Sequence, residues 1–245
     1  MDLKRILIGF IIIVALVVLY RYFFTDPTQT NLLTLGSGKD AVMKRSTMLS
    51  GNAESAYFTY SMWIYVKDWN YKLGKDKVII NRLANNGNST PIIKLGQSTN
   101  DLNISVEIYT DVEETEGGLT KMSDVCSVSN IPLQKWTHVA VSVNNRSLDT
   151  YIDGKLVKTC LLEGAPKIDG TSPVHICPPN GSNGENGFDG HVAKVRYYSR
   201  ALNPREIYEI YKEGYSGSLL GSILNKYRLR FSYIKDNEEV GSLEI

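Results

Sequence analysis

The chain has 245 residues, a formal net charge of +1 at pH 7 and a charged fraction of 22%. This balance provides no overall field that would attract nucleic acid, so we expect no nucleic-acid partner. Three cysteines are too few for a disulfide scaffold, and no Cys-x-x-Cys or His-x-x-x-His pair supplies metal ligands. We therefore expect neither a metal nor another cofactor.

The first 24 residues are typical of a membrane anchor. Basic residues precede an unbroken apolar run over residues 6–20, and Arg21 and two phenylalanines follow it. The run is shorter than the ~20 residues that cross a bilayer, but Arg21 can snorkel to the interface and let the phenylalanines complete the span. A removed secretory signal is the alternative, although no small-x-small cleavage site follows. We expect one transmembrane helix over residues 1–24, which includes Ile6, Phe10, Leu16, Tyr20 and Arg21. Basic residues flank the run on both sides, so the orientation stays open.

Residues 25–50 have a linker composition, with Thr, Gly, Ser, Lys and Asn around a single proline. We expect an extended tether. About 200 residues remain after the anchor and the tether, enough for one domain with a substantial core.

Short runs rich in Val, Ile, Tyr and Thr dominate residues 51–214, and clusters of Asn and Gly separate them. The runs cover residues 57–66, 78–83, 92–95, 102–109 and 136–143. This pattern predicts an all-β domain. Two further strands, 148–152 and 155–160, flank Asp153-Gly154, a pair that tolerates the positive φ of a type I′ hairpin turn. Asp153 is therefore interpreted as a turn residue and not as a ligand.

One helix is predicted near the end of the domain. Asn203 can cap it, Pro204 suits its first position, Glu206 can return the capping bond, and Gly214 can end it. The tail, residues 215–245, alternates again and predicts an extra strand. Its basic face, formed by Lys226, Arg228 and Arg230, is either a partner surface or a solvated edge.

Three segments resemble the concanavalin A-like lectin/glucanase superfamily in its laminin G-like form. They are residues 58–66, residues 136–141 with 151–156, and residues 188–202 with 206–207. The resemblance implies a jelly-roll sandwich of two antiparallel sheets, with Trp63 and Trp136 in the core and His138 as a hydrogen-bonded core histidine. The combined expectation is an all-β, two-sheet sandwich with one short C-terminal helix, preceded by a single transmembrane helix.

An N-terminal anchor joined to one such domain is similar to proteins encoded by large nucleocytoplasmic DNA viruses. This resemblance implies a structural protein of the virion, a minor capsid protein that links an internal membrane to the capsid shell. Its partners would be the lipid bilayer and other capsid or membrane proteins. The alternative is a lectin-like module that binds glycans at a cell or virion surface.

The sequence does not favour catalysis. Glycosidases on this fold need alternating carboxylates on one strand, and the nearest run places Glu107 and Asp111 four residues apart with no acid between them. We expect no enzyme. A loop containing Asn180, Asn183, Asn186 and Asp189 has the composition of sugar or Ca²⁺ sites, but a loop without a ligand has it as well.

At most one disulfide can form among the three cysteines. Cys126 and Cys160 each lie at the margin of the central strands, whereas Cys177 begins a loop. We expect Cys126 and Cys160 to be the pair.

Overall fold

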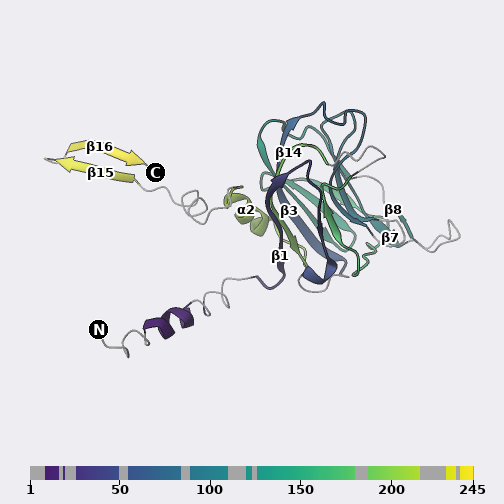
Figure 1. Cartoon of the computed structure of the whole chain (residues 1–245), viewed down its shortest axis with the longest axis horizontal. Helices are drawn as coiled ribbons and strands as arrows, with labels where there is room; N and C mark the ends of the chain where they lie inside the picture. The colour runs from purple at the N-terminus through teal and green to yellow at the C-terminus, as the bar shows by residue number, and fades with distance from the viewer. Residues whose placement is uncertain are drawn as a thin grey trace.

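Two six-stranded antiparallel sheets pack face to face (Figure 1). The computed structural model describes residues 9–16, 19, 26–49, 55–83, 89–109, 120–122, 126–179, 187–215, 230–235 and 238–244. Sheet A has the order β1 (Gln29–Ser37), β14 (Asp189–Tyr198), β3 (Tyr57–Asp68), β10 (Trp136–Asn144), β11 (Ser147–Ile152), β12 (Lys155–Leu161). Sheet B has the order β2 (Val42–Lys44), β13 (Val174–Ile176), β4 (Lys77–Leu83), β5 (Ser89–Leu95), β6 (Leu102–Ser105), β9 (Cys126–Val128). The expected all-β, two-sheet architecture is confirmed.

The main core lies between the two sheets. Alternate residues of β3 and β10 point into it, among them Tyr60, Ile64 and Val141, and residues of sheet B such as Ile93 and Ile104 meet them. The opposite face of β3 and β10 is buried as well. For β10 the sequence predicted this, because apolar and small residues occupy both of its faces.

A smaller core covers the outer face of sheet A. The helix α2 (Pro204–Lys212) packs there, and Ile207 lies against Ala140 and Tyr151 of the sheet. The predicted cap is confirmed, because the Asn203 side chain accepts from the Glu206 N–H while the Glu206 carboxylate accepts from the Asn203 N–H. Gly214 has φ 69° and follows the helix, as expected of a residue that ends it.

The expected tether over residues 25–50 is corrected by the structure. Strand β1 pairs with β14 along sheet A, and β2 pairs with β13 in sheet B. A 3-10 turn, η1 (Ser46–Met48), follows β2. The polar composition led to the wrong prediction because β1 and β2 are edge strands, which need few apolar residues. In β1 only Leu32 is fully buried.

The disulfide joins Cys126 of β9 to Cys160 of β12, the pair that the sequence indicated. It connects the edge of sheet B to the edge of sheet A, since β9 and β12 are the last strands of their sheets. Cys177 is a free, buried thiol.

Two further pairs of strands form two-stranded sheets of their own. Strand β7 (Glu107–Tyr109) pairs with β8 (Thr120–Met122), and β15 (Arg230–Lys235) pairs with β16 (Glu238–Glu244). The tail therefore forms a hairpin where one strand was expected. Arg230 lies opposite Glu244, while Lys226 and Arg228 lie outside the described residues.

The expected anchor is described only in part. Residues 9–16 and residue 19 are helical, with Phe10 and Leu16 exposed. Ile6, Tyr20 and Arg21 lie outside the described residues. In the part of the chain that the structure describes, no helix has the length and apolar composition needed to cross a membrane. The anchor stays a prediction.

Candidate functional site

Strand register gathers aromatic side chains on the outer face of sheet A. Trp136 of β10 lies opposite Tyr65 of β3, and Tyr65 lies opposite His191 of β14. One step along, His138 lies opposite Trp63. Because side chains alternate between the faces of a sheet, residues two apart on β3 and β10 share this face.

The rings in these two rows contact one another. Ring centroids of Tyr65 and Trp136 are 5.7 Å apart, those of Tyr65 and His191 are 6.3 Å apart, and those of Trp63 and His138 are 5.3 Å apart. These are the separations at which aromatic pairs attract each other.

Two tyrosines from α2 and its C-terminal end complete the cluster. Tyr211 stacks on Trp63 with centroids 5.6 Å apart, and Tyr215 stacks on Trp136 at 4.6 Å with ring planes 10° apart. We call this cluster the aromatic surface, defined by Trp63, Tyr65, Trp136, His191, Tyr211 and Tyr215.

A shallow hollow of about 350 Å³ opens on the aromatic surface. Its lining consists of Trp63, Trp136, Tyr211, Lys212, Gly214 and Tyr215. The rings differ in exposure: Trp63 is only 6% exposed and forms the floor, whereas Tyr215 is 45% exposed. Trp136 is half-buried, so the expected core position is confirmed for Trp63 and wrong for Trp136.

Ion pairs fix the C-terminal end of α2 beside the hollow. Arg196 of β14 donates to the Glu213 carboxylate at 2.7 Å, and the Lys194 ammonium donates to the Glu213 carbonyl at 3.3 Å. Cations at this position also complement the negative end of the helix dipole. The bonds hold Gly214 and Tyr215 in place over Trp136.

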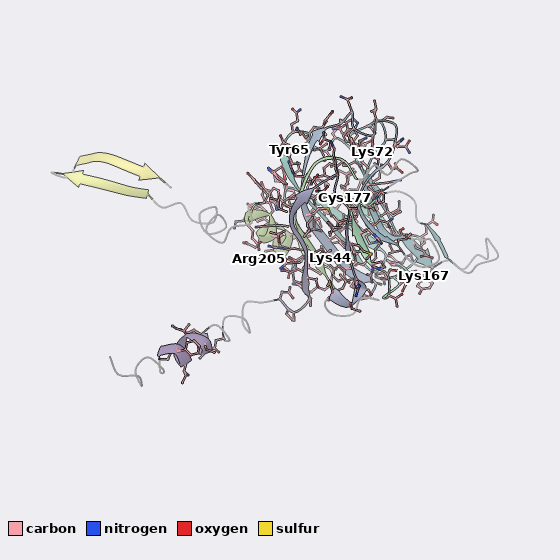
Figure 2. All side chains as sticks on the ribbon, viewed as in Figure 1. Lys44, Tyr65, Lys72, Lys167, Cys177 and Arg205 are labelled. Carbon is pink, nitrogen blue, oxygen red and sulfur yellow. A yellow bond between two sulfur atoms is a disulfide. The ribbon has the colours of Figure 1, made fainter. Side chains whose placement is uncertain are left out.

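The N-terminal end of α2 is fixed by a second group of ion pairs. Arg200 donates to Asp26 at 2.8 Å and to Glu206 at 2.7 Å, so the segment before β1 is joined to the start of the helix. A hollow of about 290 Å³ lies here, lined in part by these paired charges. Figure 2 labels Arg205, which also lines it.

His138 lies beneath α2 and is fully buried. Its Nε2 atom is 2.9 Å from the Ser61 hydroxyl, which confirms the expected hydrogen-bonded core histidine. Burial lowers the pKa of His138 to about 4; the nearby Asp153 carboxylate opposes this shift and Arg196 adds to it. The ring is therefore neutral at pH 7 and adds no charge to the floor of the aromatic surface.

Asp153 acts as the turn residue that the sequence indicated. It has φ 47°, Gly154 has φ 75°, and the Asp153 carboxylate accepts from the His138 N–H at 2.9 Å. It also pairs with Lys135.

Other candidate residues are not gathered into a site. Asp189 begins β14 and pairs with Lys39 at 3.1 Å, while Asn180, Asn183 and Asn186 lie outside the described residues. Glu107 is buried and has Lys167 at 3.5 Å, and Asp111 is not described. Within the described ranges, no three His, Cys, Asp or Glu side chains cluster as metal ligands.

The free thiol is unsuited to nucleophilic chemistry. Cys177 lies within the sandwich (Figure 2) and is fully buried. Burial raises the pKa of the Cys177 thiol to about 12, and Asp40 adds to the shift while Lys72 opposes it. The thiolate, which is the reactive form, is therefore scarce at neutral pH.

Comparison with known proteins agrees with the fold. Residues 37–208 match the family model described as the concanavalin A-like lectin/glucanases superfamily, in its laminin G-like form. The chain belongs to this superfamily. Over 163 residues it is 26% identical to adhesion G-protein coupled receptor V1 of Danio rerio; this match covers 64% of the chain and 2% of that receptor.

Two solved structures show the same architecture. The receptor binding domain of botulinum neurotoxin mosaic serotype C/D is 16% identical with a TM-score of 0.52, over 74% of this chain and 41% of that one. The binding domain of serotype D is 17% identical with a TM-score of 0.51, over 74% and 42%. Both likenesses concern the fold.

Sequence reasoning missed the aromatic surface as a unit. Trp136 and Trp63 were assigned to the core, and Tyr215 was assigned to the tail. The Asp153-Gly154 turn follows β11, and β11 pairs with β10, so this register places Trp136 and His138 at the end of β10 near the turn. The pairing of β3 with β14 has no comparable local signal.

The two tryptophans should respond differently to truncation. Trp63→Ala removes a buried ring, so we expect the free energy of unfolding to fall by about 3–5 kcal/mol. Trp136→Ala removes a half-buried ring that contacts Tyr65 and Tyr215, so a smaller loss of about 1–2 kcal/mol is expected. Urea unfolding of both variants checks this, and equal losses would contradict the assignment of Trp136 to the surface.

The depressed pKa of His138 predicts a pH dependence of stability. The unfolded chain binds a proton at His138 below about pH 6.5, whereas the folded chain does so only below about pH 4. Stability should therefore fall by up to about 3 kcal/mol as the pH decreases through this window and level off below it. His138→Asn should remove this component, measured as the difference between the two urea-unfolding profiles; parallel profiles would refute the assignment.

Proposed function

We propose that this chain is a non-enzymatic binding protein that recognises a protein partner through its aromatic surface. The observation that carries the proposal is the stack of Tyr215 on Trp136 at the mouth of a hollow. Trp and Tyr are enriched among the residues that contribute most to protein interfaces, and a rigid platform loses little side-chain entropy on binding.

The lining of the hollow favours a protein over a glycan. Among its described residues, Lys212 is the only charged side chain, and the lining includes no Asn, Asp, Gln or Glu. Sugar hydroxyls are recognised by such groups, which supply both acceptors and donors. A relative named as an adhesion receptor gives independent support for a binding role.

We further propose that residues 1–24 hold the domain at a membrane. In this proposal the protein is a single-pass minor capsid protein that ties an internal virion membrane to the capsid shell. The apolar run over residues 6–20 and the resemblance to anchored proteins of large DNA viruses support it. The second candidate is a glycan-binding module, which the exposed ring of Tyr215 supports, since sugar rings can stack on aromatic faces.

The aromatic surface can be tested by photocrosslinking in the native assembly. A photoreactive phenylalanine at Tyr208, which is exposed and lies beside Tyr211, should give one dominant protein adduct. Adding Trp136→Ala should reduce the adduct about tenfold or more, because it removes the stacking platform. The matched control is Tyr109→Ala, an exposed tyrosine on β7.

Loss of the adduct in the Tyr109 control as well would mean that the effect is not local. A glycan array that gives hits dependent on Trp136, together with no protein adduct, would replace the protein partner with the glycan alternative.

The anchor predicts resistance to alkaline carbonate extraction. The chain should stay in the membrane pellet, whereas Ile12→Arg with Leu16→Arg should release it, because each charge at the centre of a span costs about 2.5–3.5 kcal/mol. Release of the unaltered chain would rule out the anchor and leave the binding role of the domain intact.

A further inference from the structure

The last strand of sheet A is unusually open. β12 has one strand partner, β11, and six of its seven residues are exposed. Leu156, Val157 and Leu161 are 49%, 47% and 77% exposed. The other edge strands are either short, like β2 and β9, or more buried, like β1.

β12 is held firmly in this open position. The tight Asp153-Gly154 turn fixes its beginning, and the disulfide from Cys160 to Cys126 fixes its end to sheet B. Its unpaired edge is therefore preorganised for a further strand, so little conformational entropy is lost on pairing.

Two exposed lysines mark this edge. Lys155 and Lys158 are exposed, and neither makes an ion pair with any residue that the structure describes. Positive charge on an edge strand discourages indiscriminate pairing. It also selects among partners, because a strand with acidic residues gains where a basic strand is repelled.

We propose that β12 is a docking edge that takes an extended, acidic strand of a partner protein as a seventh strand of sheet A. Backbone hydrogen bonds to β12 would supply affinity, apolar side chains would cover Leu156 and Val157, and carboxylates would meet the two lysines. A second copy of β12 fits less well. If two copies paired antiparallel about their middle residue, their Lys158 side chains would lie opposite or next to each other and repel.

The docking edge adjoins the aromatic surface but does not include it. Tyr208 and Tyr211 of α2 lie over Gly154, where an added Cβ would be 3.1 Å and 3.0 Å from them. A strand laid along β12 therefore begins beside α2 and runs away from the hollow. The two surfaces can hold one partner or two, and they can be tested separately.

The test uses the full chain in detergent and a labelled, end-capped peptide of alternating Glu and Val. Fluorescence anisotropy should show binding of this peptide and little binding of the matched Lys and Val peptide. Lys155→Glu with Lys158→Glu should weaken binding of the acidic peptide about tenfold and strengthen binding of the basic one. Hydrogen exchange should show new protection at residues 155–161.

Two controls separate strand addition from charge attraction. Only one edge of the bound peptide would pair with β12. N-methylation of the peptide nitrogens on that edge should abolish binding, whereas N-methylation of the nitrogens on the peptide's other edge should preserve binding. Trp136→Ala should leave binding unchanged, so failure here and failure of the aromatic surface are distinguishable.

The proposal is overturned by equal binding of the acidic and basic peptides, by binding that both N-methylated peptides retain, by protection outside residues 155–161, or by no binding. Self-association of the chain that depends on β12 would replace the acidic strand with a second copy.

Discussion

Burial of both faces of sheet A is the constraint on which the rest of the structure depends. The inner face of β3 and β10 meets sheet B, but the outer face carries Trp63, His138 and Ala140, which also need cover. Among the residues that the structure describes, the nine-residue helix α2 supplies that cover. It is too short to shield the whole face, so the aromatic rings at its C-terminal end stay partly open to solvent. The aromatic surface lies where the C-terminal end of α2 meets this face: Tyr211 covers Trp63, while Trp136 and Tyr215 stay partly exposed.

The position of α2 must therefore be precise, and ion pairs at each end provide this precision. Arg200 holds the start of the helix and Arg196 holds Glu213 at its end. Isolated ion pairs on the surface contribute little to stability. A half-buried ion pair that fixes the orientation of a helix can nevertheless set the direction of a side chain at the end of that helix. Here the side chain is Tyr215, whose ring lies parallel to that of Trp136. The neutral His138 below it adds no charge to the floor of the aromatic surface.

Local signals in the sequence predicted most of the domain. The hairpin at Asp153-Gly154 and the capped helix at Asn203 depend on neighbouring residues, so the sequence alone was sufficient. Edge strand β1 was taken for a tether, because pairing with β14 involves residues more than 150 positions away and leaves few apolar residues in β1. The aromatic surface depends on three strands in register and on a helix, and so no short segment carries its signal.

The pairing of β1 with β14 determines how the domain would respond to tension. The chain enters the sandwich at Asp26, and β14 leads to α2 at the same end of the ladder, where Gln29 lies opposite Tyr198. A force applied between the N-terminal segment and α2 would therefore break the hydrogen bonds between β1 and β14 one after another. It would not load all of these bonds at once. Arg200 is bonded to both Asp26 and Glu206, so its ion pairs lie at the end of the ladder where this opening would begin. Exposed ion pairs contribute little to stability, so resistance to this force would come mainly from the successive bonds between β1 and β14.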